Sequence, residues 1–138
     1  MTQGIYISAM TPQSGKTLVA LGLTDTMFKR TDALGFFRPV FDGTSPEDDP
    51  VLQLMKRTFD LPDSRCRGAV SLERCREILA SGEHDELDSA AVAVYSEMAR
   101  ECDVIVVDGT DLVAHNAATA EFDLNARLAN NMGCSVLA

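Results

Sequence analysis

The chain has 138 residues, with 12 Lys and Arg against 21 Asp and Glu, which gives a formal net charge of −9 at pH 7. Hydrophobic residues make up 46% of it, enough for the core of one domain and too much for a disordered chain. The acidic balance argues against a general nucleic-acid-binding protein, and no apolar run approaches the roughly 18 residues of a membrane span. We therefore expect a single domain over residues 1–138, with no nucleic-acid partner and no membrane partner.

Strand and helix patterns alternate along the chain. In the first helix, Val19, Leu23 and Met27 recur every four residues, which predicts one apolar face. Ala20 and Phe28 flank this face. The predicted strands are residues 4–9, 33–40, 104–108 and 134–138, and the predicted helices are residues 16–30, 51–59, 71–80, 85–102 and 121–132.

Helix ends and buried faces are marked by the same patterns. Ser71 is expected to be a plain N-cap, because Arg74 stands where a capping box needs Glu or Gln. Residues 41–50 are rich in Gly, Pro, Ser and Asp and residues 60–68 are polar, so we expect loops there. A third loop is expected over residues 111–120. Two helices have clear inward faces, predicted as Leu52, Met55 and Phe59 in one and Leu87, Ala91, Val94, Tyr95 and Met98 in the other.

The order of these elements is β-α-β-α-α-α-β-α-β. Strands that alternate with helices predict a parallel sheet with helices on both faces. The fold class that we expect is therefore α/β, with three layers and a mostly parallel sheet of four strands. Because the chain stops inside the apolar segment 134–138, we expect it to be truncated at its C-terminal strand and to be part of a longer protein.

The segment Ser14-Gly15-Lys16-Thr17 joins the first predicted strand to the first helix. In a phosphate-binding P-loop, backbone N–H groups surround the phosphates, a Lys reaches the β and γ oxygens, and a Ser or Thr hydroxyl ligates Mg²⁺. We therefore predict that these four residues bind a nucleotide, with Thr17 as a magnesium ligand. The alternative is an exposed helix start with no ligand.

The loop departs from the full motif G-x-x-x-x-G-K-[ST]. Met10 stands at the position of the leading Gly, and Ala9 stands where a loop one residue longer would place it. Glycine adopts positive φ angles that alanine tolerates poorly, and Pro12 removes one N–H that could have faced a phosphate. These departures weaken the case for a bound Mg-nucleotide, so a P-loop that is kept only for its fold is an equal alternative.

A second signal is the apolar run 104–107 followed by Asp108 and Gly109. An acidic residue at the end of a buried strand is the Walker B arrangement, in which the carboxylate holds Mg²⁺ or its water near the P-loop. We predict Asp108 as a metal ligand together with Thr17. Alone, the same residues would describe an ordinary Asp-Gly turn.

A third signal is Arg38, at the end of the strand predicted over residues 33–40. A cation at this edge of the sheet can bind a phosphate or carboxylate, so Arg38 is a candidate ligand-binding residue. An ion pair with Asp42 or Asp108 is the equally weighted alternative. Asp48 and Asp49 in the next loop could add metal ligands, although acidic residues in loops are usually solvated.

The four cysteines, at positions 66, 75, 102 and 134, form no C-x-x-C pair, and the two histidines do not cluster with them. This spacing excludes a typical zinc site. The N-terminus lacks the basic and apolar regions of a signal peptide. We expect reduced thiols and a cytoplasmic location, with Cys102 and Cys134 as small core residues.

Taken together, these motifs resemble the N-terminal domain of the long bacterial phosphate acetyltransferases, which is similar to dethiobiotin synthetase, a P-loop enzyme. The resemblance covers essentially the whole chain. It rests on residues 5–8 with the loop at 14–17, on 37–40, on 106–110, and on the helix 125–129 with the strand after it.

The resemblance implies a P-loop NTPase-like fold and a regulatory, oligomer-stabilising domain that responds to metabolites. It implies that a separate C-terminal domain, a partner within the same protein, transfers acetyl groups between acetyl-CoA and phosphate. Dethiobiotin synthetase has Lys where this chain has Arg38, and arginine does not readily release its proton. The alternative to a regulatory domain is an active ATP-dependent ligase or nucleotide-hydrolysing domain. If the chain is the regulatory domain, we expect a homo-oligomer.

Overall fold

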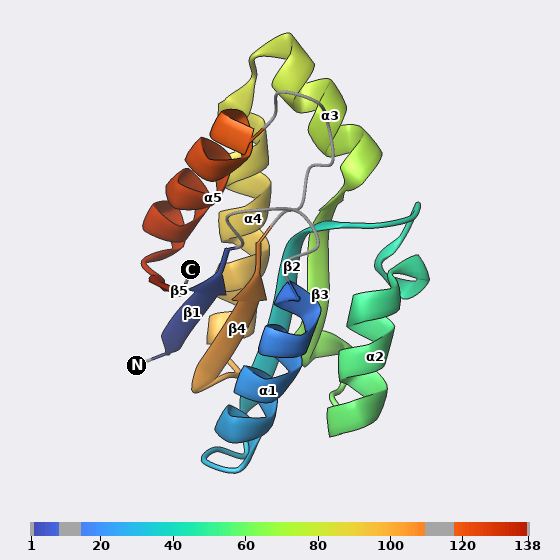
Figure 1. Cartoon of the computed structure of the whole chain (residues 1–138), viewed down its shortest axis with the longest axis vertical. Helices are drawn as coiled ribbons and strands as arrows, with labels where there is room; N and C mark the ends of the chain where they lie inside the picture. The colour runs from blue at the N-terminus through green and yellow to red at the C-terminus, as the bar shows by residue number, and fades with distance from the viewer. Residues whose placement is uncertain (1, 9–14, 110–117, 138) are drawn as a thin grey trace.

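The structure is a computed structural model and describes residues 2–8, 15–109 and 118–137. The strands are β1 (Gln3–Ile7), β2 (Leu34–Phe41), β3 (Cys66–Ser71), β4 (Val104–Asp108) and β5 (Ser135–Leu137). The helices are α1 (Lys16–Phe28), α2 (Pro50–Phe59), α3 (Leu72–Ser81), α4 (His84–Ala99) and α5 (Ala118–Met132), with short 3₁₀ turns η1 (Pro46–Asp48) and η2 (Asp63–Arg65). The strands form one parallel sheet in the order β3-β2-β4-β1-β5, which confirms the predicted fold class (Figure 1).

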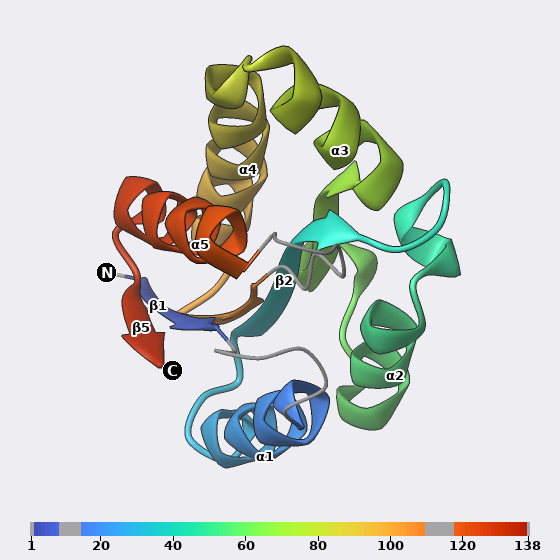
Figure 2. The ribbon, with the colours of Figure 1, turned by 45° about the horizontal axis from the view of Figure 1, so that its top comes forward.

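Helices cover both faces of this sheet, so the domain has three layers. Figure 2 shows α1 and α2 on one face and α3, α4 and α5 on the other. Each face has its own hydrophobic core. Successive strand residues point to opposite faces, so Phe36 lies in the core under α1 and α2 while Phe37 lies in the core under α4 and α5. This alternation decides which face each candidate side chain of the sheet can reach.

Strand β3 was absent from the sequence prediction, which placed a polar link at residues 60–68. The strand forms the sheet edge beside β2, and all six of its residues are partly buried, so no alternation of apolar and polar residues marks it. In the structure, a Cβ atom at Gly68 would lie 2.5 Å from the Phe41 ring, so glycine is what allows this ring to lie against the strand.

The predicted apolar face of α1 is partly wrong. Val19 and Phe28 are exposed, while Ala20 and Thr24 are fully buried. The buried Thr24 hydroxyl is satisfied because it donates to the Ala20 carbonyl at 2.6 Å. Phe28 packs at the end of the helix against Phe59, with ring centroids 5.4 Å apart. The sheet therefore meets the side of α1 that carries its small residues.

The other four predicted helices are present, although α4 ends at Ala99 and not at residue 102, and α5 begins at Ala118, inside the predicted loop 111–120. The predicted inward residues of α2 are buried, and those of α4 are buried except for Val94, which is partly buried against the core. The Ser71 side chain caps α3 by accepting from the Arg74 backbone N–H at 3.1 Å, and Gly82 ends the helix. Cys102 is buried, and Cys134 packs against the core. None of the helices in the described part of the chain is long and apolar enough to cross a membrane.

Candidate functional site

The candidate residues meet at the carboxyl edge of the sheet, because parallel strands all end there. Strand β4 lies between β1 and β2, so Asp108 at its end is central. In the strand register Val107 is level with Phe37 and Asp108 is level with Ile7. Arg38 is therefore next to Asp108 on the neighbouring strand. Alternation places both side chains on the face that α1 and α2 cover.

Arg38 forms the centre of a buried ion cluster with Asp49 and Asp108. Its Nη1 atom lies 2.6 Å from Asp49 Oδ2, and its Nε atom lies 3.0 Å from Asp108 Oδ2. Asp49 is 0% exposed and Asp108 is 1% exposed. Asp42 lies farther out, 3.9 Å from Nη1 and 57% exposed. Buried charges need partners of this kind, and the two carboxylates meet the guanidinium through different nitrogen atoms.

Asp49 links three parts of this edge. Its Oδ1 atom accepts from the Leu52 backbone N–H at 2.9 Å, which caps α2. Its Oδ2 atom accepts from the Asp42 backbone N–H at 2.8 Å as well as from Arg38. Asp49 is thus a buried structural residue and not the solvated loop acid that the sequence favoured. Asp48 is exposed and accepts from Thr44 Oγ1 at 3.0 Å within its own loop.

The start of α1 carries the described part of the predicted P-loop. Gly15 is the N-cap and has a φ of 81°, a left-handed conformation that favours glycine. Its carbonyl accepts from the Val19 N–H at 3.1 Å, and Thr17 is exposed. Ser14, Ala9, Met10, Pro12 and the side chain of Lys16 lie outside the described residues. The nucleotide role of Ser14, Gly15, Lys16, Thr17 and Arg38 stays a prediction.

On the opposite face of the sheet, a polar pair lies behind Asp108. The Tyr6 hydroxyl donates to Asn125 Oδ1 at 2.6 Å, which joins β1 to α5 inside the core. Gly109 follows Asp108, and its N–H donates to the Ile7 carbonyl at 2.8 Å. A Cβ atom at Gly109 would lie 2.6 Å from that carbonyl oxygen and 2.9 Å from Asn125 Oδ1. The chain can therefore leave β4 along this path only with glycine at this position.

The sequence reasoning did not single out this pair as a polar contact. The available signal was the spacing of Asn125 between the apolar Leu124 and Leu128, which places an amide on the buried face of α5. A buried amide needs a partner, and Tyr6 supplies it.

The donors around Asp108 are a poor match for the predicted magnesium ion. Magnesium prefers near-octahedral oxygen ligands at about 2.0–2.1 Å and keeps several waters. Asp108 is enclosed and already faces a guanidinium, while Thr17 is exposed. Within residues 2–8, 15–109 and 118–137, no group of three or more His, Cys, Asp and Glu side chains could hold a metal ion. Asp108 would have to exchange its contact with the Arg38 guanidinium for a metal ion, and the magnesium role of Thr17 and Asp108 stays a prediction.

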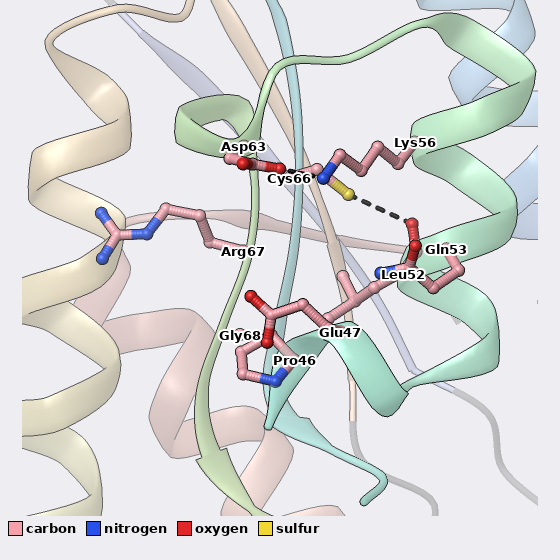
Figure 3. A pocket seen from close by; sticks show the side chains of 9 residues that line it. All are labelled: Pro46, Glu47, Leu52, Gln53, Lys56, Asp63, Cys66, Arg67 and Gly68. Atoms are coloured by element: carbon pink, nitrogen blue, oxygen red, sulfur yellow. Dashed lines mark hydrogen bonds and ion pairs between the residues drawn. The ribbon is translucent and has the colours of Figure 1, made fainter. Parts of the chain in front are cut away.

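A separate pocket lies beside the edge strand β3, between η1, α2 and β3 (Figure 3). In it, Lys56 pairs with Asp63, and the Cys66 Sγ atom donates to the Leu52 carbonyl at 3.3 Å. Arg67 points away and pairs with Glu97 of α4 at 2.5 Å. The cavity volume of about 190 Å³ is smaller than the roughly 300–1,000 Å³ of small-molecule sites. Because of its small volume, this pocket is a weaker candidate for a nucleotide site than the carboxyl edge of the sheet.

The thiols are structural. All four cysteines are free. Burial raises the pKa of the Cys66 thiol to about 12 and the pKa values of Cys75 and Cys102 to about 11. Burial also raises the pKa of Cys134. Because the thiolate is the nucleophile, these shifts make the four residues poor candidates for covalent catalysis.

Comparison with known proteins identifies the family to which the chain belongs. A family model described as an AAA domain matches residues 3–138. The chain belongs to this family. It is 32% identical over 139 aligned residues to a phosphate acetyltransferase of Nitratidesulfovibrio vulgaris, and 29% identical over 139 to a phosphate acetyltransferase of Synechocystis sp.. Each alignment covers 99% of this chain and 20% of the relative.

These matches confirm the resemblance to phosphate acetyltransferases that the motifs indicated. The chain spans about one fifth of the length of these curated relatives. The names of these relatives describe proteins that are about five times longer than this chain.

Proposed function

We propose that this chain is the N-terminal regulatory and oligomer-stabilising domain of a phosphate acetyltransferase. In that protein, a separate C-terminal domain converts acetyl-CoA and phosphate into acetyl phosphate and CoA. The proposal rests on the difference in alignment coverage, since nearly all of this chain matches only a fifth of each relative. A segment of this kind contributes a domain to the enzyme and leaves the acetyl transfer to the rest of it.

The ion cluster favours this proposal over an ATP-dependent ligase. The dethiobiotin synthetase resemblance would ask the residue at position 38 to take part in substrate carboxylation. Here Arg38 is held by two buried carboxylates, Asp49 and Asp108. A guanidinium in that setting stays protonated and fixed, which suits a structural role.

Exposed apolar residues support a partner domain or a second copy of the chain. Strand β5 is exposed along its whole length and has β1 as its neighbour in the sheet. Val136 and Leu137 on this strand are exposed, and Leu18 at the start of α1 is 73% exposed. Four free thiols are in keeping with a reducing compartment, and we propose a cytoplasmic location on that basis.

A chimeric enzyme tests the proposal. The matching fifth of the Nitratidesulfovibrio vulgaris phosphate acetyltransferase is replaced by this chain, and a second version lacks that fifth. We expect the chimera to keep both acetyl phosphate formation and the oligomeric mass in sedimentation. The shortened enzyme should lose oligomeric mass or its response to metabolites. If the shortened enzyme keeps both, or if the 138 residues alone transfer acetyl groups, the proposal is wrong.

Calorimetry separates this proposal from the ligase alternative. Mg-ATP is titrated into the chain and into its Lys16→Ala variant. Micromolar binding that the variant loses, together with measurable turnover, would establish the ligase or hydrolase and contradict a non-catalytic domain. Absence of binding up to millimolar ATP would support a P-loop kept for its fold.

A further inference from the structure

Among the residues that the structure describes, two buried carboxylates and one buried guanidinium meet at the carboxyl edge of the sheet. Asp49 and Asp108 are both buried there, and both lie within hydrogen-bonding distance of one guanidinium. In a metal-dependent phosphate site, two carboxylates so close together would share a divalent cation. Here the cation that lies between them is the side chain of Arg38.

We propose that Arg38 is the built-in cation of this site, and that its single positive charge takes the position that a divalent metal ion would otherwise have between Asp49 and Asp108. The native domain then does not bind Mg²⁺ through these carboxylates. This proposal concerns the ion cluster itself, so it holds or fails independently of the regulatory role.

The fixed position of each partner supports the proposal. Asp49 cannot turn to a metal ion without giving up its bonds to the Leu52 and Asp42 backbone N–H groups, at 2.9 and 2.8 Å. Asp108 leaves β4 into Gly109, whose close approach to the Ile7 carbonyl restricts the backbone. Arg38 lies on a central strand and is itself buried. All three residues are buried.

Charge supports it as well. A divalent ion bound to Asp49 or Asp108 would lie within a few ångströms of the guanidinium, and like charges at that separation repel strongly in a buried site. Arginine cannot relieve the repulsion by losing its proton. A metal ion could therefore enter only if Arg38 left a position where two carboxylates hold it.

The first test is metal binding by the native chain. Mn²⁺ binding is followed by water-proton relaxation, and Mg²⁺ is followed by thermal unfolding at constant ionic strength. We expect no stoichiometric Mn²⁺ site in the millimolar range and no rise in Tm with Mg²⁺. One submillimolar Mn²⁺ site per chain that is lost in Asp108→Asn would overturn the proposal. This measurement does not depend on any Arg38 variant folding.

The second test removes the built-in cation. In Arg38→Met, the two carboxylates lose their shared partner, and we expect Mn²⁺ affinity to rise by about tenfold or more, because unit charges at about 4 Å interact by several times RT. Adding Asp49→Asn should cancel the gain. A folded Arg38→Met chain, judged by its circular dichroism, that gains no affinity would contradict the proposal.

Arg67→Met is the matched control. It removes the same charge from an arginine that pairs with Glu97 on the other face of the sheet. We expect it to gain no Mn²⁺ site. An equal gain in both variants would mean that net charge, and not the ion cluster, governs metal binding, and the proposal would fail.

Discussion

Replacing Asp49 tests the reasoning about the ion cluster most directly. The side chain is 0% exposed, caps α2 and holds Arg38 at 2.6 Å. Asp49→Ala removes the cap, worth about 1 kcal/mol, and one of the two buried partners of a cation. Removing one partner of a buried pair costs about 3–5 kcal/mol, and the lower end applies because Asp108 remains. We expect a total loss of about 3–5 kcal/mol in the free energy of unfolding.

A loss of that size is a large part of the stability of a typical domain, so the isosteric Asp49→Asn is the more practical variant. Its amide oxygen can still accept from the Leu52 N–H, but its charge is gone. We expect it to lose about 2–3 kcal/mol. With a urea m-value of about 1–3 kcal/mol/M, the midpoint should fall by about 1 M or more.

Asp42→Asn is the matched control for this measurement. Asp42 also faces Arg38, but at 3.9 Å and with 57% of its side chain exposed. Exposed ion pairs contribute about 0–1 kcal/mol, so its urea midpoint should barely move. If Asp49→Asn is no more destabilising than Asp42→Asn, the cluster does not stabilise the fold in the way described.

Three further predictions follow from other contacts. Gly109→Ala should lose about 1–3 kcal/mol in the free energy of unfolding by urea, because its Cβ would lie 2.6 Å from the Ile7 carbonyl oxygen. In the control Gly22→Ala, a Cβ would meet nothing within 4 Å, so this variant should gain about 0.5–1 kcal/mol. Equal effects of the two substitutions would contradict the close approach at Gly109. Tyr6→Phe breaks the 2.6 Å bond to Asn125 and should cost about 1–3 kcal/mol in the same assay, and an unchanged midpoint would refute its importance. Burial raises the pKa values of Cys66, Cys75 and Cys102 to about 12, 11 and 11 from an ordinary value near 9, so the unfolded chain releases protons that the folded chain keeps. Their contribution to stability is therefore present below pH 9 and is lost as the pH rises toward 11; unfolding that is independent of pH between 9 and 10.5 would contradict it.

Local pattern was sufficient for much of the fold. The uninterrupted apolar run 104–107 predicted β4 with its bounds, because a strand buried on both faces needs apolar residues throughout. The helical spacing of Leu52, Met55 and Phe59 predicted the buried face of α2, because packing requires one continuous stripe. Strand β3 was not predicted, because an edge strand is only partly covered and shows no apolar pattern. Its Gly68 allows the Phe41 ring to pack against the strand.

The candidate site was likewise predicted only in part from the sequence. Strand ends are readable from sequence, so Arg38 and Asp108 were placed correctly at one edge of the sheet, and an ion pair between them was among the expected alternatives. The strongest partner of Arg38, Asp49, could not be distinguished from the adjacent Asp48. Only one of these two acids starts α2 and turns inward, and that depends on where the helix packs.

By itself, the sequence determined the alternation of strands and helices, the acidic residue at the end of β4 and the family, because these depend on residues close together along the chain. Tertiary structure alone decided which charges meet. Arg38 reaches Asp49 because α2 folds back over β2, and Tyr6 meets Asn125 across 119 positions because β1 and α5 pack together. Such contacts arise from the closing of the whole sheet, and burial then gives them their energy, since a charge or hydroxyl withdrawn from water must find its partner inside the protein.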